Sequence, residues 1–348
     1  MRPRIFVTQP IRPSALARLR GFADVTVHAD EAQVIGRDAL LAGVKDCDIL
    51  LSLLHDRIDR EVIAANPRLR AIASMSITPD GIDVAEATAR RIPVTVVPAL
   101  AVESTADICF GLILALARRM VEGDRLVRQG VFPGSQSNHL IGAGVFGKTI
   151  GLVGGRGRIG KAVARRARGF SMRILYCGPH PMDAAEEREL GATYVQLDRL
   201  LPEADYVSLH QALKPETRHM IGARELALMK PTAFLINTAR GAVVDEAALL
   251  SALAEGRIAG AGLDVFENEP LVDPALLALP NVVLTPHLGS AVIEVREQMA
   301  NTVVDNIVAI LDGRVPPNCA NPEVYASPSS SSPAKAADPV DAGSRSER

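Results

Sequence analysis

The stretch GKTIGLVGGRGRIGKAVARRARG, residues 147–169, decides the fold. An apolar run at 150–153 leads into Gly155, Gly157 and Gly160, and Ala- and Arg-rich sequence with helical spacing follows. This order predicts a strand, a tight turn and a helix. In a G-x-G-x-x-G turn the first glycine permits the bend, the second lets a pyrophosphate approach the backbone, and the third lets helix pack on strand. The positive end of the helix dipole would face the phosphates, so we expect a dinucleotide here.

The sequence around this turn argues against the alternative interpretation, a chance glycine-rich β-turn. A second apolar strand is expected at 172–177, which completes a βαβ unit. Gly154 is an additional glycine ahead of the motif, so the loop is expected to bulge by one residue.

The end of the second strand bears on the choice of dinucleotide. NAD-selective sites place an Asp or Glu there to bind the ribose 2′-hydroxyl, whereas this chain has Gly178, Pro179 and His180. Without a carboxylate nothing repels a 2′-phosphate, yet neither Arg nor Lys stands there to bind one. His180 is the one candidate, and an exposed loop histidine is an equal alternative. The sequence therefore predicts NAD(P) and favours NADP(H) only through the missing carboxylate.

The whole-chain composition excludes several classes of protein. A chain of 348 residues exceeds what one core usually holds, so we expect two domains. With a net charge of −2 and no long Lys/Arg block, we expect no nucleic-acid or membrane partner. No long apolar run or leader-like segment occurs, which favours a cytoplasmic protein. The four cysteines lack C-x-x-C spacing, so we expect free thiols and no metal.

Strand-like and helical segments alternate along the chain. This alternation predicts an α/β fold of doubly wound parallel sheets, with ligands bound at the carboxyl ends of the strands. His55 follows the third strand and is interpreted as a solvated loop residue rather than a catalytic one. We expect strands at 4–8, 25–27, 49–53, 71–73, 150–153, 172–177, 194–195, 206–210, 233–237, 262–266 and 282–285, and helices at 14–20, 37–44, 60–65, 104–120, 246–255 and 293–311.

Three further segments bear on association and disorder. The helix expected at 104–120 is apolar around most of its circumference, so it must be buried in a core or against a second subunit. Residues 131–146 are rich in Gly and Ser and are a candidate arm over a partner, which favours a homodimer. Residues 323–348 are rich in Ser, Pro and Ala and predict a disordered tail.

Polar side chains at three strand ends carry the candidate chemistry. Reducing a 2-oxo acid requires, besides a hydride, a cation for the carboxylate, a proton donor for the carbonyl oxygen, and a carboxylate that keeps this donor protonated. Arg240 can bind a carboxylate with two hydrogen bonds. His287 can donate a proton near neutral pH, and Glu269 would raise its pKa. A structural Arg–Glu pair beside a satisfied histidine is the alternative, and spacing alone does not separate the two.

Residues 147–176, 229–270 and 279–291 carry a family resemblance. They resemble the D-2-hydroxyacid dehydrogenase family, and the resemblance extends over roughly residues 1–322. Arg240, Glu269 and His287 match the catalytic set of that family, and Asp264 matches the residue that holds the nicotinamide carboxamide. Residues 104–107 and the arginine-rich sequence downstream are most similar to the glyoxylate/hydroxypyruvate reductase branch.

The resemblance also implies an arrangement of domains and ligand contacts. A discontinuous, flavodoxin-like substrate domain would comprise 1–99 and 288–322, and a dinucleotide-binding domain would comprise 100–287, with a hinge that closes over the ligands. Substrate contacts are implied for Leu54, Ser76, Ile77, Thr78, Arg240 and His287. Cofactor contacts are implied for Thr105, Gly155, Gly157, Arg158, Ile159, Gly160, Gly178, His180, His210, Thr217, Thr238, Ala239, Asp264 and Gly289.

Two departures from the family pattern concern the ligands. Ser76-Ile77-Thr78 stand where the family usually has Gly-Val-Gly, and their side chains alter both the reachable dihedrals and the room for a substrate. Gln211-Ala212 replace an apolar-Pro pair. We expect an enzyme that reduces glyoxylate, hydroxypyruvate or a related small 2-oxo acid. The alternatives are the same fold acting on another small anion or a sugar acid, and a non-catalytic dinucleotide sensor.

Overall fold

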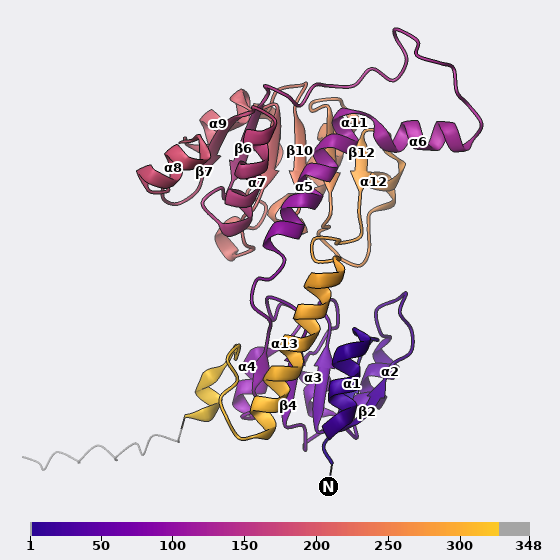
Figure 1. Ribbon diagram of the computed structural model, residues 1–348, viewed down its shortest axis with the longest axis vertical. Coiled ribbons are helices and arrows are strands. Elements are labelled where there is room, and N and C mark those ends of the chain that lie inside the picture. Colours follow the sequence, from indigo (N-terminus) through magenta and orange to yellow (C-terminus); the bar gives the residue numbers. More distant parts are fainter. Residues whose placement is uncertain (1, 327–348) are drawn as a thin grey trace, which may run out of the picture.

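Residues 2–326 are described by the computed structural model, and within them the strands form two parallel sheets with helices on both faces (Figure 1). This confirms the predicted α/β class. The first sheet has the order β2-β1-β3-β4-β5, the flavodoxin-like order of the doubly wound folds. Its strands are β1 (Arg4–Val7), β2 (Asp24–Val27), β3 (Ile49–Ser52), β4 (Ala71–Ser74) and β5 (Val94–Thr95).

The second sheet has the order β12-β11-β10-β9-β6-β7-β8, and all its pairs are parallel. Counted from β6, this is the dinucleotide-binding order 3-2-1-4-5-6 with one more strand. The order reverses between β6 and β9, and ligands bind at such a switch point. The strands are β6 (Thr149–Val153), β7 (Arg173–Cys177), β8 (Ala192–Tyr194), β9 (Tyr206–Leu209), β10 (Phe234–Asn237), β11 (Gly260–Leu263) and β12 (Val282–Leu284).

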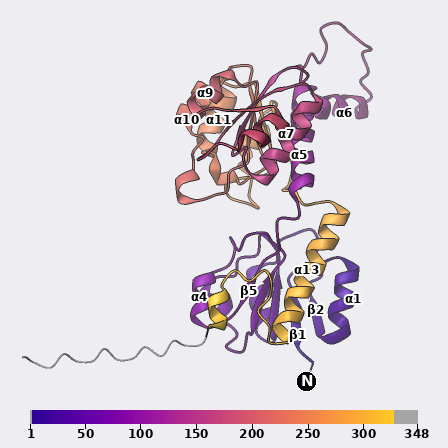
Figure 2. The same cartoon turned by 60° about the vertical axis from the view of Figure 1, so that its left-hand side comes forward.

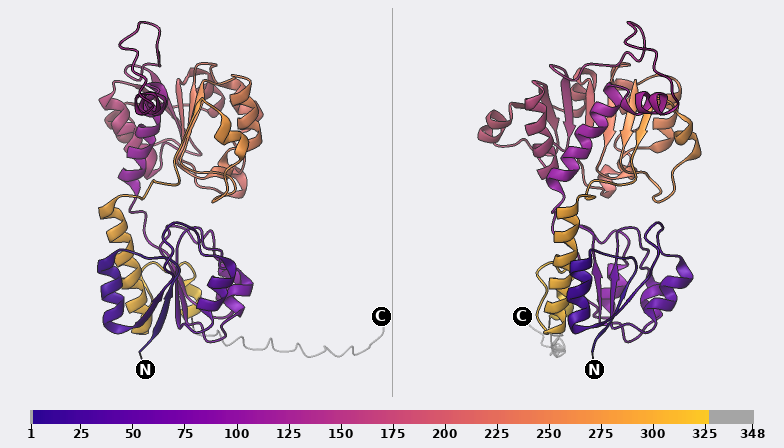
Figure 3. Two further views of the ribbon diagram at one scale, coloured as in Figure 1. Left: turned by 90° about the vertical axis from the view of Figure 1, so that its right-hand side faces the viewer. Right: turned by 45° about the vertical axis from the view of Figure 1, so that its right-hand side comes forward.

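Helices cover both faces of each sheet, so the central strands are buried on two sides and read as continuous apolar runs (Figure 3). The helices of the first sheet are α1 (Pro13–Phe22), α2 (Arg37–Val44), α3 (Arg60–Ala64), α4 (Val84–Ala89) and α13 (Ile293–Leu311). Those of the second part are α5 (Val102–Ala117), α6 (Met120–Arg128), α7 (Arg158–Gly169), α8 (Ala184–Leu190), α9 (Leu197–Glu203), α10 (Ala223–Leu228), α11 (Glu246–Ala254) and α12 (Pro274–Ala278). No helix in the described chain is long and apolar enough to cross a bilayer.

The chain passes from the first sheet to the second ahead of α5 and returns after β12 through α13 (Figure 2). The long helix α13 packs against α1 and β4 of the first sheet. These passages lie close to the predicted boundaries at 99 and 288. The assignment of substrate to one part and dinucleotide to the other stays a prediction.

Local chemistry accounts for some of the element ends. The Asp245 carboxylate caps α11 by accepting from the N–H of Ala248 (3.0 Å), and α13 has the predicted bounds. Gly154 has φ +86°, and a Cβ there would lie 2.9 Å from the carbonyl carbon of His210. The additional glycine is therefore needed for both the left-handed backbone and the close approach of the residue that follows β9.

The helix predicted at 104–120 is wrong at both ends. α5 begins at Val102, and Ala101 before it has no polar side chain that could cap the helix. The hydroxyl of Ser104 donates to the carbonyl of Gly289 (2.7 Å). The helix ends at Ala117, and Arg119 at φ +50° separates it from α6.

The predicted start of the disordered tail at 323 is also wrong. Pro322–Tyr325 form a short 3-10 helix in which Val324 is buried. The Arg91 guanidinium donates to the carbonyls of Val324 (3.1 Å) and Ala326 (2.8 Å), which holds this segment against the first part of the chain. The rest of the predicted tail, residues 327–348, lies outside the described residues.

Candidate active site

The glycine turn after β6 fits closely against its surroundings. A Cβ on Gly155 would lie 2.6 Å from the Cβ of Tyr176, and one on Gly160 would lie 2.6 Å from the Cα of Gly155. α7 begins directly after Gly157, with no side chain bonded to its first N–H groups. Its N-terminus is thus an open anion site behind a turn that only glycines can form.

Two buried polar atoms, at the ends of the neighbouring strands β9 and β10, lack partners. Among the described residues, neither Nδ1 of His210 nor Oγ1 of Thr238 has a hydrogen bond. Burial lowers the pKa of His210 from 6.5 to about 4, so the ring is neutral at physiological pH. Buried polar groups without partners are costly, and those at a binding site point to a polar ligand. Together with the glycine turn, these atoms fit a dinucleotide.

A cavity of about 610 Å³ lies at the carboxyl ends of both sheets, a size suited to a small-molecule site. It brings together side chains that are far apart in the sequence. From the predicted set, its wall contains Leu54, Ser76, Ile77, Thr78, Thr105, Ile159, His210, Thr238, Ala239, Arg240, Asp264, His287 and Gly289. The wall does not include the predicted Gly155, Gly157, Arg158, Gly160, Gly178, His180, Thr217 or Glu269.

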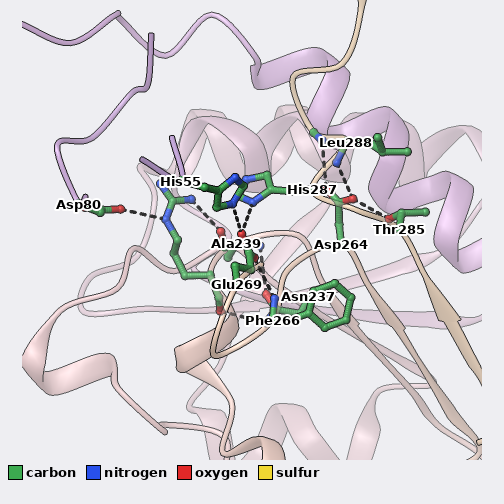
Figure 4. Close-up of polar contacts among 12 residues, drawn as sticks. His55, Asp80, Asn237, Ala239, Asp264, Phe266, Glu269, Thr285, His287 and Leu288 are labelled. Atoms are coloured by element: carbon green, nitrogen blue, oxygen red, sulfur yellow. Dashed lines mark hydrogen bonds and ion pairs between the residues drawn. The ribbon is translucent and has the colours of Figure 1, made fainter. Parts of the chain in front are cut away.

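A carboxylate–imidazole pair stands at one side of this cavity. Nδ1 of His287 lies 2.8 Å from Oε2 of Glu269, and Oε1 of Glu269 accepts from the N–H of Phe266 (2.9 Å) (Figure 4). Burial raises the pKa of the Glu269 carboxyl, but hydrogen bonds from His287 and His55 outweigh burial and bring this pKa from 4.5 to about 2. Glu269 is therefore ionised, and its negative charge lies against Nδ1 of His287. The other ring nitrogen of His287, Nε2, is the one left for a ligand.

The loop that carries His287 is held by Asp264. His287 has φ +56°, a left-handed conformation that is uncommon for a residue with a side chain, and its N–H donates to the carbonyl of Asp264 (2.9 Å). The buried Asp264 carboxylate accepts from Thr285 Oγ1 (2.6 Å) and from the N–H groups of Leu288 (2.7 Å) and Gly289 (2.9 Å). Burial raises the pKa of Asp264. Asp264 thus organises the His287 loop, a task that the resemblance did not indicate.

Arg240 projects from the turn after β10 toward the first sheet. Asn237 shapes this turn: its side chain donates to the carbonyl of Arg240 (3.0 Å) and accepts from the N–H of Ala239 (3.0 Å). Across the cavity, the guanidinium of Arg240 lies 3.3 Å from an oxygen of Asp80 (Figure 4). It also lies 3.1 Å from Thr78 Oγ1. The structure therefore places the predicted cation next to the loop that departs from the family pattern.

The interpretation of His55 as a solvated residue is wrong. Its Nε2 lies 2.6 Å from Oε2 of Glu269, and its side chain is 31% exposed. No local signal marks it, because its partner is 214 positions away in the sequence. Its place in the loop that follows β3, at the carboxyl edge of the sheet, is the one indication that the sequence offers.

Arg296, in the first turns of α13, is a second residue that the sequence did not single out. It lines the cavity, and burial lowers its pKa. Within residues 2–326, no carboxylate lies at ion-pair distance from its guanidinium. The cavity thus contains two guanidinium groups suited to an anionic ligand.

His55, Glu269 and His287 also have the ligand types of a zinc site, with ligand atoms within 4.8 Å of one another. Both imidazoles, however, approach a single carboxylate oxygen at hydrogen-bond distance. The observed contacts are those of a hydrogen-bonded triad, and we assign no metal to it.

A Rossmann-type sheet with a glycine turn, and an imidazole–carboxylate pair in the loops that follow its strands β11 and β12, define a nicotinamide-dependent dehydrogenase. The family model described as "D-isomer specific 2-hydroxyacid dehydrogenase, NAD binding domain" matches residues 110–289. The glyoxylate reductase of Korarchaeum cryptofilum is 50% identical over 326 residues, which cover 93% of this chain and 97% of that protein. The chain belongs to the D-isomer specific 2-hydroxyacid dehydrogenase family.

Solved structures agree with this membership. A protein from Thermus thermophilus has 43% identity and a TM-score of 0.83, with 91% of this chain and 99% of that chain covered. The NADPH-dependent glyoxylate/hydroxypyruvate reductase of Sinorhizobium meliloti, solved in complex with NADP and malonate, has 34% identity and a TM-score of 0.74. That comparison covers 92% of this chain and 98% of the other.

Proposed function

We propose that this enzyme reduces glyoxylate, hydroxypyruvate or a closely related small 2-oxo acid with NAD(P)H. The observation that carries the proposal is the ionised Glu269 bonded to His287 at a cavity that also contains Arg240. The names of the relatives support the same substrates.

Each polar residue of the site has a separate role in the proposed reaction. A bound reduced nicotinamide would supply the hydride to the carbonyl carbon. Arg240 binds the substrate carboxylate and orients the carbonyl. His287 gives the proton on Nε2 to the carbonyl oxygen, so that the oxo group becomes a hydroxyl, and Glu269 stabilises the imidazolium before this transfer. The neutral imidazole then regains a proton from solvent.

The direct test follows the absorbance of the reduced nicotinamide with glyoxylate and with hydroxypyruvate, each with NADH and NADPH at equal concentration. Turnover with either substrate is expected. If neither acid is reduced while both dinucleotides bind, the proposal is wrong in its substrate. The alternatives would then be another small anion or sugar acid, admitted by the Ser76-Ile77-Thr78 loop, or a dinucleotide sensor.

We infer that NADPH is used in preference to NADH, because residues 178–182, which directly follow β7, contain no carboxylate. A Cβ on Gly178 would meet nothing within 4 Å, so an Asp can be introduced there without strain. Gly178→Asp should repel a 2′-phosphate and offer a partner to a 2′-hydroxyl. We expect the ratio of kcat/KM for NADPH to that for NADH to fall by at least about tenfold, ~1.4 kcal/mol. The matched control is Gly178→Asn, of the same size without charge. An unchanged ratio in the Asp variant would contradict this inference.

We also infer a homodimer formed through α6 and the segment after it, which project from the rest of the second part (Figure 1). Phe132, Ile141 and Phe146 there are 80%, 62% and 76% exposed, an apolar surface that needs a partner. Phe132→Glu should raise the dimer dissociation constant by at least about tenfold, ~1.4 kcal/mol, in sedimentation velocity. Leu277→Glu, at an exposed leucine of α12, is the control. A monomeric wild-type protein would refute the inference.

A further inference from the structure

His55 and His287 share one oxygen atom of Glu269. Oε2 lies 2.6 Å from Nε2 of His55 and 2.8 Å from Nδ1 of His287, while Oε1 is held by the N–H of Phe266 (2.9 Å) (Figure 4). The two rings meet edge to face, with centroids 5.6 Å apart. The contact therefore joins three side chains around one negative charge.

The two imidazoles reach this oxygen from different sheets. His55 follows β3 of the first sheet, whereas Glu269 and His287 follow β11 and β12 of the second. Glu269 is the hydrogen-bond partner that the structure gives to the His55 side chain. His55 thus connects the first sheet directly to the carboxylate of the proton-donating pair.

Sharing the oxygen weakens what Glu269 does for His287. A hydrogen bond from His55 withdraws part of the charge that stabilises the His287 imidazolium, and a protonated His55 adds a like charge 5.6 Å away, centroid to centroid. Both effects lower the affinity of His287 for its proton. Because interacting groups titrate together, the effect belongs to the triad as a unit.

Two other carboxylates near the rings act on them through charge and not through a hydrogen bond: Asp56 on His55 and Asp264 on His287. The carboxylate of the adjacent Asp56 accepts from the N–H of Leu53 (2.7 Å) and from the hydroxyl of Thr8, and burial raises its pKa. The other charged groups that line the same cavity are Glu31, Asp80, Arg240, Asp264 and Arg296. Arg240 and Asp80 pair with each other at 3.3 Å, and Asp264 is engaged by the His287 loop. None of these groups is hydrogen-bonded to His55 among the described residues.

We propose that His55 is a positioning residue of the reaction, which limits the proton affinity of His287 by sharing Oε2 of Glu269 and so sets the alkaline limit of activity. This proposal rests on the proposed reduction, in which His287 must carry a proton. As a consequence, activity should be lost at a lower alkaline pH than an isolated Glu–His pair would give.

Two variants test the proposal. His55→Leu removes both the hydrogen bond and the charge, and His55→Gln keeps a neutral donor of similar reach. The alkaline midpoint of kcat/KM, which reports groups of the free enzyme, should rise by roughly half a unit or more in the Leu variant. The Gln variant should lie between it and the wild type. An unchanged or lowered midpoint in both variants overturns the proposal.

A second measurement separates this proposal from the proposed function. The imidazole NMR signals of His287, identified as those that His287→Asn removes, can be titrated without any substrate. The pH midpoint of these signals should rise in His55→Leu, as the alkaline midpoint of kcat/KM does. An NMR midpoint equal to that of the wild type overturns the proposal. If no 2-oxo acid is reduced, the NMR titration still decides the role of His55 on the pair, and only the proposed function fails.

Discussion

Replacing His287 by asparagine should lower kcat for 2-oxo acid reduction by a factor of about 10²–10⁴, the usual contribution of a positioned general acid. Asparagine suits the site because it tolerates the left-handed backbone that His287 adopts at φ +56°. Its amide can still donate a hydrogen bond but cannot release a proton. The affinity for the dinucleotide, measured by quenching or calorimetry, should change little, because the glycine turn and α7 are untouched.

The chain offers a matched control for this substitution. His219 also has a left-handed backbone (φ +53°) and also bonds a carboxylate, at 2.7 Å from Glu267, but it lies outside the cavity wall. His219→Asn should therefore keep the rate within a few-fold of wild type. Equal losses in both variants would mean that the backbone conformation, and not proton donation, explains the effect.

The fold was predictable where the physics is local. The glycine turn, the Asp245 cap of α11 and the bounds of α13 each follow from residues within a few positions of one another. The strand expected at 262–266 shows the limit of this approach. β11 is Gly260–Leu263, and a Cβ on Gly260 would lie 2.4 Å from the carbonyl oxygen of Asn281. Close packing of a neighbouring strand selects glycine there, against its low strand propensity.

The site was predictable only in outline. The rule that parallel strands end at one edge correctly places Arg240 and His287 beside the same cavity. It cannot say which loop of the first sheet meets them, since this depends on how the two sheets face each other. The contacts of Glu269 with His55 and of Arg240 with Asp80 span 214 and 160 positions. No pattern within either loop carries that information.

Replacing Glu269 by glutamine should move the alkaline limb of the kcat/KM profile to lower pH by roughly one to three units, the range expected for loss of an adjacent opposite charge. Glu269, with a pKa of about 2, is ionised across the working range and stabilises the imidazolium. Removing that charge lets His287 lose its proton earlier as pH rises. At a pH above the new midpoint, kcat/KM should fall about 10- to 1000-fold, in step with the lost protonated fraction.

The lowered pKa of Glu269 also predicts how the stability of the wild-type protein changes at acid pH. A carboxyl whose folded pKa is lowered from 4.5 to about 2 stabilises the native contact above the unfolded value, and this contribution is lost as pH falls from 4.5 toward 2. Glu269→Gln should therefore flatten that part of the stability profile measured by thermal unfolding.

Glu267→Gln, which removes the carboxylate beside His219, is the control for the rate profile. The decisive comparison is one of sign, because loss of Glu269 should lower the alkaline midpoint, whereas loss of His55 should raise it. Shifts in the same direction would show that the two side chains do not compete for the charge that holds the proton on His287.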